Sequence, residues 1–153
     1  MEIERKWKLE TLLGDVRLRG GVPILQGYIV AESNEVRLRK KGSHYFITAK
    51  SDGTLSREEW ETEIPRWVFE VLWPKTEGCR IEKIRYTISA PGGLFLEFDE
   101  YSGSLNGLVV LEIEFPNKAA AEAFKLPPGF RGQDVTNDKR YKNKNLALNG
   151  IPK

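Results

Sequence analysis

The stretch Glu2–Trp7, with the sequence EIERKW, decides the fold of this chain, because charged residues recur in it at every second position. In a β-strand this spacing places Glu2, Glu4 and Lys6 on one face, which is then ionic. Buried charges are tolerated only when they are paired or bound to a metal or ligand. Taken alone, such a strand favours a solvated position at the edge of a sheet.

The same charged alternation recurs along the chain, which a single edge strand does not explain. Further examples are Glu35-Val-Arg37-Leu-Arg39, Glu59-Trp-Glu61-Thr-Glu63, Lys83-Ile-Arg85, Glu97-Phe-Asp99 and Glu112-Ile-Glu114. If these strands closed into a barrel, their ionic faces would line the inside and their apolar faces would pack outward against helices. A lumen of this kind requires a highly charged ligand with metal ions, because confined unpaired charges cost several kcal/mol each. The alternative is a half-open sheet whose charged face is solvated and crossed by ion pairs.

The periodicity of the chain predicts a mainly β fold of the α+β class, with eight strands and a few outer helices. Strands are expected at residues 2–7, 25–31, 34–41, 45–50, 56–64, 80–89, 94–101 and 108–115. Helices are expected at 65–73, 118–125 and 138–144, the last of them basic and capped by Thr136 or Asn137. We therefore predict an eight-stranded antiparallel closed β-barrel, a tunnel with a charged lumen. Its four tryptophans are expected to pack on the outer face against helices: Trp7, Trp60, Trp67 and Trp73.

The composition excludes several classes of site. The 153 residues carry 24 Lys and Arg against 22 Asp and Glu, so any anion site is local and no nucleic-acid partner is indicated. A single cysteine and a single histidine, Cys79 and His44, exclude thiolate metal clusters and multi-histidine sites. The chain has no apolar run long enough to span a membrane and no signal-peptide pattern. We expect one domain over residues 1–153, a cytoplasmic location, no membrane partner, and a monomer or weak homodimer.

The order of these motifs resembles the CYTH superfamily of triphosphate tunnel metalloenzymes. Glu2-x-Glu4-x-Lys6 matches the ExExK signature of that superfamily, and the resemblance extends over essentially the whole chain. Further matching segments are Glu35-Val-Arg37-Leu-Arg39, Thr48-Ala-Lys50, Glu61-Thr-Glu63, Glu82-Lys83-Ile-Arg85-Tyr86, Leu96-Glu97-Phe-Asp99 and Leu111-Glu112-Ile-Glu114-Phe115. The 72–86 and 138–143 segments are similar to those of the small bacterial members that prefer inorganic tripolyphosphate.

The resemblance implies a set of site residues. Arg and Lys grip phosphate oxygens through charge-assisted hydrogen bonds, and carboxylates are ligands for Mg²⁺ or Mn²⁺. The implied phosphate-binding residues are Lys6, Arg37, Arg39, Lys50, Lys83 and Arg85, joined by Lys139 and Arg140 if the C-terminal helix caps one tunnel mouth. The alternative for this helix is an exposed basic face. The implied metal ligands are Glu2, Glu4, Glu112 and Glu114, with Glu61, Glu63, Glu97 and Asp99 as secondary candidates. The implied catalytic residues are Tyr28, Lys83 and Glu4, with Tyr28 and Lys83 as a proton-handling pair.

The function implied by the resemblance is metal-dependent hydrolysis of tripolyphosphate to pyrophosphate and orthophosphate, with Mg²⁺ or Mn²⁺ as cofactor. One alternative is action on an organic triphosphate, such as hydrolysis of thiamine triphosphate or a nucleotide, or cyclisation of ATP as in class IV adenylyl cyclases. Another is a non-catalytic polyphosphate-binding module. The same charged residues would serve all three.

Overall fold

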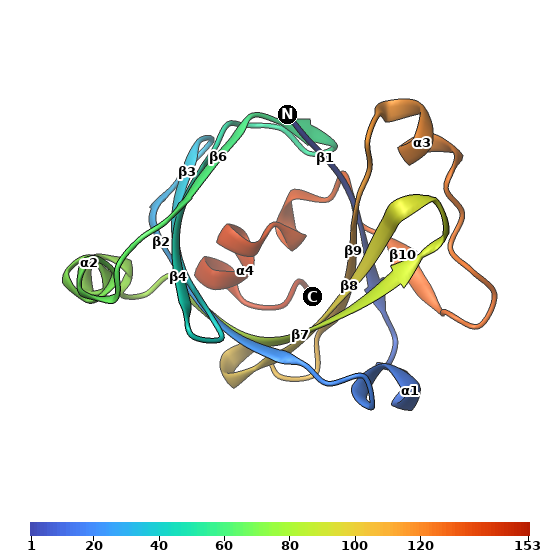
Figure 1. Cartoon of the computed structure of the whole chain (residues 1–153), viewed down its shortest axis with the longest axis horizontal. Helices are drawn as coiled ribbons and strands as arrows, with labels where there is room; N and C mark the ends of the chain where they lie inside the picture. Colours follow the sequence, from blue (N-terminus) through green and yellow to red (C-terminus); the bar gives the residue numbers. More distant parts are fainter.

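The structure is a computed structural model that describes all residues from 1 to 153, and its strands form one antiparallel sheet (Figure 1). The strands are β1 (Glu2–Leu9), β2 (Val22–Ala31), β3 (Glu35–Lys41), β4 (His44–Lys50), β5 (Ser56–Arg57), β6 (Glu59–Glu63), β7 (Arg80–Ala90), β8 (Leu94–Ser102), β9 (Val109–Glu114) and β10 (Gly132–Asp134). The sheet order is β10-β1-β9-β8-β7-β2-β3-β4-β6, and β5 pairs with β1 off this path. The predicted mainly β class is confirmed.

All the predicted strands are present, but the one expected at residues 56–64 is divided. Arg57 of β5 pairs with Glu2 of β1, whereas Glu59 of β6 pairs with Lys50 of β4. The segment thus crosses from the β1 edge to the β4 edge, with Glu58 between its two parts. Because β6 and β1 do not pair with each other, the sheet is not closed by one continuous ladder. The closed barrel stays a prediction.

The larger apolar cluster lies on the outer face of the curled sheet, as the charged alternation predicted. Phe98, Leu111 and Ile113 are fully buried and belong to one cluster with Trp7. Ala121 of α3 (Lys118–Ala123) packs into this cluster from outside. A second cluster, around Leu108 and Val110, includes Leu146 from α4 (Asn143–Asn149). The first cluster therefore covers the outer side of the strands. The second cluster lies on the same side of the sheet as the charged residues, because Val110 and Tyr101 have the strand parity of Glu112 and Asp99, and it packs against α4 at one end of the ring.

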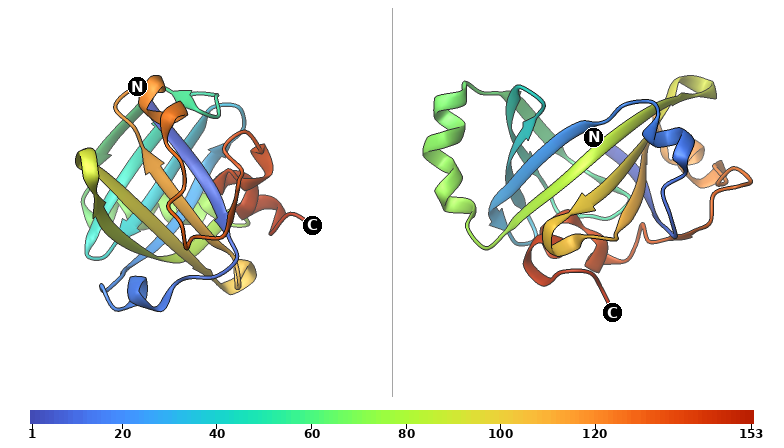
Figure 2. Two further views of the ribbon diagram at one scale, coloured as in Figure 1. Left: turned by 90° about the vertical axis from the view of Figure 1, so that its right-hand side faces the viewer. Right: turned by 90° about the horizontal axis from the view of Figure 1, so that it is seen from below.

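The remaining helices are short and lie around the sheet. They are α1 (Gly14–Arg17), α2 (Arg66–Leu72), and the 3₁₀ helices η1 (Trp73–Thr76), η2 (Pro91–Gly93), η3 (Gly103–Leu105) and η4 (Lys139–Tyr141). Figure 1 shows α4 through the ring of strands, and Figure 2 shows that α4 lies at one end of that ring. None of the helices has the length and apolar composition needed to cross a membrane.

Two of the tryptophan predictions are wrong. Trp60 and Trp67 are 60% and 67% exposed. Helix α2 buries only Phe69, which lies 5.0 Å from the Tyr45 ring and stacks on Trp73. Trp60 is exposed because β6 pairs with a strand on one side only, and all of its residues are exposed. Helical spacing identified α2, but it did not identify which side of the helix contacts the sheet.

The C-terminal basic segment also differs from the single helix that was predicted. Residues 138–149 form η4 and then α4, and Lys142 between them has the extended conformation φ −62°, ψ 136°. The side chain of Asp138, rather than Thr136 or Asn137, caps η4 by accepting a hydrogen bond from Arg140 N at 3.1 Å. The break directs Lys142 and Lys144 inward, where both are buried.

Candidate active site

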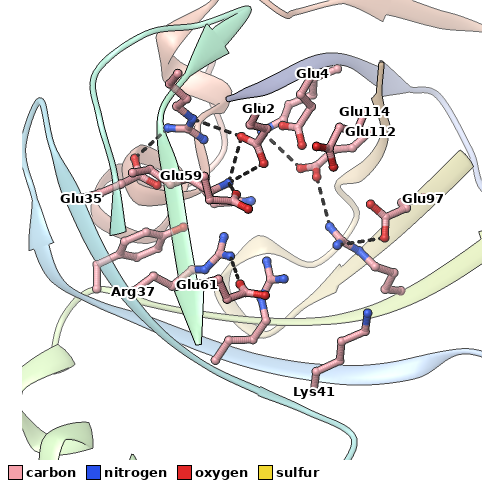
Figure 3. A pocket seen from close by; sticks show the side chains of 17 residues that line it. Glu2, Glu4, Glu35, Arg37, Lys41, Glu59, Glu61, Glu97, Glu112 and Glu114 are labelled. Atoms are coloured by element: carbon pink, nitrogen blue, oxygen red, sulfur yellow. Dashed lines mark hydrogen bonds and ion pairs between the residues drawn. The ribbon is translucent and has the colours of Figure 1, made fainter. Parts of the chain in front are cut away.

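The ionic face of the sheet encloses a cavity of about 180 Å³ (Figure 3). Of its 17 lining residues only one is hydrophobic. The carboxylates are Glu2, Glu4, Glu35, Glu59, Glu61, Glu97, Glu112 and Glu114, and the cations are Lys6, Arg37, Arg39, Lys41, Lys50, Arg57 and Arg85; Tyr28 and Asn143 complete the lining. Such a lining is suited to a small, multiply charged ligand rather than to an apolar one.

One cluster of ion pairs surrounds Glu2. Lys50 Nζ lies 3.1 Å from Glu2 Oε2 and 3.2 Å from Glu59 Oε2. Arg57 Nε lies 3.4 Å from Glu2 Oε1, and Arg57 Nη1 lies 3.1 Å from Glu35 Oε2. Because these contacts join β1, β3, β4 and β5, they connect strands on both sides of the gap where β6 and β1 do not pair. Both Glu2 and Glu35 are buried, and each lies within ion-pair distance of more than one cation, the second at Glu35 being Lys144 at 3.8 Å.

A second cluster surrounds Glu112 on β9. Lys6 Nζ lies 3.4 Å from Glu112 Oε1, and Arg85 Nη2 lies 3.1 Å from Glu112 Oε2. Burial alone would raise the pKa of Glu112, but the charges of Lys6 and Arg85 lower it well below its ordinary value. Glu112 is therefore ionised, and its Oε1 atom is buried and accepts no hydrogen bond.

Arg85 is oriented by the fully buried carboxylate of Asp99. Asp99 accepts hydrogen bonds from Arg85 Nε at 2.7 Å and from Arg85 Nη2 at 2.8 Å, a bidentate arrangement. Asp99 also accepts one from Lys83 Nζ at 2.8 Å. Burial lowers the pKa of Lys83 to about 7 in spite of this carboxylate. The pair fixes the plane of the Arg85 guanidinium in the cavity wall.

Two carboxylates and two cations of the cavity form no ion pair. Glu4 lies directly opposite Glu114 in the β1–β9 ladder. Burial, followed by the charges of Glu112 and Glu2, raises the pKa of Glu4 to about 8, and burial raises the pKa of Glu114 as well. Across the cavity, Arg39 donates only to Gln26 Oε1, at 3.3 Å, and Lys41 extends from the wall without a partner (Figure 3). The ionisable groups without an ion-pair partner are thus carboxyls on β1 and β9 and cations on β3.

Comparison with known proteins places the chain in a family, although no family model matches it. A protein from Nitrosomonas europaea named inorganic triphosphatase is 50% identical over 149 residues, which are 96% of this chain and 97% of that protein. An inorganic triphosphatase from Acetivibrio thermocellus is 39% identical over 153 residues, covering 97% of this chain and 94% of the relative. The chain belongs to the inorganic triphosphatase family of the CYTH superfamily.

Solved structures of the family have the same fold. A crystal structure of an inorganic triphosphatase matches with a TM-score of 0.69 at 45% identity, and covers 100% of this chain and 97% of its own. A protein from Hippeastrum, described as having a dominant triphosphatase activity, matches with a TM-score of 0.60 at 15% identity. It covers 80% of this chain and 83% of its own, and at this identity it shows the fold alone.

The structure brings most of the predicted phosphate-binding residues of this family together. Those that line the cavity are Lys6, Arg37, Arg39, Lys50 and Arg85. Lys83 lies behind this layer, with its side chain fully buried. Lys139 and Arg140 are exposed and do not line the cavity, and Arg140 pairs with Asp138 at 2.7 Å. The C-terminal segment contributes Asn143 to the lining instead.

Tyr28 and Lys83 lie on neighbouring strands but form no hydrogen bond with each other. Ile24 is the residue of β2 opposite Lys83, four positions from Tyr28, which is about 13 Å along a strand. The Tyr28 hydroxyl lines the cavity and accepts from Gln26 Nε2 at 3.1 Å. Burial raises the pKa of Tyr28 above its ordinary value, so this hydroxyl is protonated.

The secondary carboxylate candidates occupy different positions. Glu61 and Glu97 line the cavity, where Glu61 lies 3.6 Å from Arg37 and Glu97 lies 3.3 Å from Arg85. Asp99 lies beneath the lining. Glu63 is exposed and contacts His44 at 3.2 Å, outside the cavity. Of the four, Glu63 alone has no connection to the site.

The sequence reasoning missed Arg57, Glu35, Glu59, Lys41 and Asn143 as site residues. For Arg57 a signal was available, because it has the same parity as Glu59 and Glu61 on the expected strand. Lys41 likewise continues the alternation of Glu35, Arg37 and Arg39. Asn143 had no such signal, since it belongs to a helix from the far end of the chain.

The predicted metal ligands all line the cavity. No three Asp, Glu, Cys or His side chains lie close enough together in the structure to hold one metal ion. Glu4 and Glu114 face each other without a cation, and Glu112 Oε1 is buried without a hydrogen bond. Carboxylate oxygens are the ligands preferred by Mg²⁺ and Mn²⁺. The residues therefore fit a divalent cation at the seam between β1 and β9.

Proposed function

We propose that this protein hydrolyses inorganic tripolyphosphate to pyrophosphate and orthophosphate in a reaction that depends on Mg²⁺ or Mn²⁺. The observation that carries the proposal is the cavity, in which all but two of the lining side chains are acidic or basic. The family relatives named inorganic triphosphatase support the same substrate class. A ligand that matches this lining has several negative charges and brings cations with it.

Phosphate binding is assigned to the basic residues of the cavity. Arg37 Nε is buried and has no hydrogen-bond partner, so its N–H group is available to donate to a phosphate oxygen. Arg39 and Lys41, which form no ion pair, add charge on the same strand. Arg85 is oriented by Asp99, which reduces the side-chain entropy lost when a phosphate oxygen binds.

Cation binding is assigned to Glu2, Glu4, Glu112 and Glu114. A bound divalent cation would neutralise charge on the phosphates and acidify a water for in-line attack. These carboxylates would hold that cation beside the substrate. Burial and the charges of Glu112 and Glu2 raise the pKa of Glu4, so Glu4 would give up its proton on binding the cation. Glu4 is for this reason assigned a catalytic as well as a ligand role.

Proton transfer is assigned to Tyr28 and Lys83. Tyr28 is within the cavity lining and can orient a water or a phosphate oxygen through its hydroxyl. Lys83 has a pKa near neutrality, which suits a general base. It lies behind the lining and is linked to it through Asp99, which accepts hydrogen bonds from both Lys83 and Arg85. We also propose that the chain functions in the cytoplasm as one domain, as a monomer or weak homodimer.

The test is a panel of triphosphates. Orthophosphate release is measured for tripolyphosphate, ATP and thiamine triphosphate, with Mg²⁺ and with EDTA in its place. Hydrolysis of tripolyphosphate that requires Mg²⁺ is the expected result. Faster hydrolysis of ATP or thiamine triphosphate, or formation of cyclic AMP, would assign an organic triphosphate instead. Tight binding of tripolyphosphate without phosphate release would identify a binding module.

A further inference from the structure

Arg57 contacts two carboxylates on opposite sides of the cavity. Its side chain is 12% exposed, with Nε 3.4 Å from Glu2 on β1 and Nη1 3.1 Å from Glu35 on β3. Glu2 and Glu35 are more deeply buried than Arg57 itself. These contacts lie where the sheet ladder is interrupted, since β5 alone joins the β4 side to β1.

The charge on Arg57 competes with any cation for Glu2. A carboxylate has about four lone-pair sites, and those of Glu2 are directed at Arg57 and at Lys50, which lies 3.1 Å away. Glu4, on the same strand face, has no basic partner at all. The four carboxylates of the seam are therefore unequal in the free protein: Glu4 is available to a divalent cation, and Glu2 is not.

A multiply charged anion in the cavity would reverse this difference. Phosphate oxygens attract guanidinium groups strongly and bidentately, so an anion beside Arg57 draws its charge away from Glu2. We propose that Arg57 is a positioning residue that holds Glu2 away from divalent cations until triphosphate occupies the cavity. The inference rests on the proposed function in taking triphosphate as the anion. It predicts that triphosphate and divalent cation each tighten the binding of the other.

The test measures binding of Mn²⁺, through the loss of the electron paramagnetic resonance signal of the free ion. In the triphosphate-free protein, Arg57→Gln is expected to tighten Mn²⁺ binding by at least about tenfold, because Glu2 loses a competing cation. A residue that only supports the fold would weaken Mn²⁺ binding when replaced. An unchanged or weaker Mn²⁺ affinity in a variant that melts as the wild type does would overturn the proposal.

Two controls separate the local effect from net charge. Arg140→Gln removes the same charge from an exposed side chain that pairs with Asp138, outside the cavity, and Mn²⁺ affinity should stay within about twofold of the wild type. Arg57→Lys keeps the charge, and its Mn²⁺ affinity should lie nearer to the wild type than to Arg57→Gln. Equal tightening in all three variants would contradict the assignment to Arg57.

A second measurement leaves the chain unaltered. Imidotriphosphate, whose bridging nitrogens resist hydrolysis, is added at saturation to the wild-type protein, and Mn²⁺ binding is corrected with a protein-free blank. Affinity for Mn²⁺ should rise by at least about tenfold, and by less in Arg57→Gln. If Arg57→Gln does not fold, the wild-type result decides, and absence of coupling rejects the inference. Failure to hydrolyse tripolyphosphate would reject the proposed function and leave these binding results standing.

Discussion

Glu4 and Glu114 lie directly opposite each other on β1 and β9, and neither carboxylate forms an ion pair. Like charges in directly opposite positions of a ladder destabilise a sheet. The neighbouring pair in the same ladder, Lys6 and Glu112, has opposite charges and a contact of 3.4 Å. In the β1–β9 ladder the Lys6–Glu112 pair is thus neutral, whereas the Glu4–Glu114 pair has two carboxyls and no cation. A cation bound at the second pair would relieve the repulsion between the two carboxylates.

The first prediction concerns turnover. Glu4→Gln removes the charge but little volume, so it should lower kcat by at least about a hundredfold while the protein remains folded. Addition of EDTA to the wild type should have a comparable effect. Phosphate release from tripolyphosphate and the circular dichroism spectrum are the two measurements. An active Glu4→Gln enzyme, or full activity in EDTA, would remove the metal assignment.

The second prediction concerns stability without divalent cations. Because the folded-state pKa of Glu4 is raised to about 8 from 4.5, the folded protein binds more protons than the unfolded chain between these values. The free energy of unfolding should therefore fall as pH rises from about 5 to about 8, by on the order of a few kcal/mol. Urea titrations in EDTA measure this slope. Glu4→Gln should flatten it, and an identical slope in the variant would contradict the cause given.

The third prediction concerns the buried network beneath Arg85. Asp99→Asn would leave Arg85 and Lys83 without their shared carboxylate, and should lower the free energy of unfolding by about 3–5 kcal/mol. Glu70→Gln is the control, since it breaks the exposed Glu70–Arg66 pair on α2 and should change stability little. Urea denaturation of both variants makes the comparison. Equal effects would show that the buried position of Asp99 is unimportant.

Which side chains of a strand face the cavity could be predicted from the sequence, because successive side chains point to opposite sides of a strand. This rule placed Glu2, Glu4 and Lys6 in one wall of the cavity, and it holds for Arg57, Glu59 and Glu61 as well. It did not indicate that residues 56–64 are divided between two partners, β1 for Ser56–Arg57 and β4 for Glu59–Glu63. Periodicity carries no information about which strand lies alongside.

Partner choice within the cavity could not be predicted for a similar reason. Lys50 and Glu2 are 48 residues apart in the chain, and Arg57 and Glu35 are 22 apart, so their contacts depend on the curvature of the whole sheet. The sequence therefore predicted a charged lumen without distinguishing the paired Glu2 from the unpaired Glu4. Nor did it show that Lys139 and Arg140 lie outside the cavity, because they belong to η4, a separate turn that the extended Lys142 divides from α4.

The fourth prediction concerns Lys83 as a proton acceptor. Its pKa is lowered to about 7 from 10.5, so the neutral amine predominates above neutral pH. If Lys83 acts as a general base, kcat should rise through pH about 7 in the wild type, and Lys83→Met should remove that rise. Tyr28→Phe, which keeps the ring and loses the hydroxyl, should lower kcat and leave this pH dependence in place. If Lys83→Met raises KM alone, Lys83 serves only to bind phosphate.

The last prediction concerns the choice among triphosphates. Tyr28 is the single hydrophobic residue of the cavity lining, and the exposed Trp60 and Trp67 are not among the lining residues, so binding energy should come almost wholly from the phosphates. An organic substituent would add little attraction and would require desolvation and steric fit. Tripolyphosphate should therefore have the highest kcat/KM, at least about tenfold above ATP and thiamine triphosphate, or roughly 1.4 kcal/mol in transition-state binding.

Pyrophosphate extends the same comparison to chain length. With one phosphate fewer it leaves some of the cavity cations without an oxygen partner, and unpaired buried charges oppose binding, so its kcat/KM should be the lowest of the panel. Initial rates of phosphate release at several concentrations of each substrate give the four values, and analysis of the ATP products should detect no cyclic AMP. Equal kcat/KM for ATP and tripolyphosphate would mean that the cavity mouth attracts the nucleoside, in conflict with recognition through phosphate charge alone.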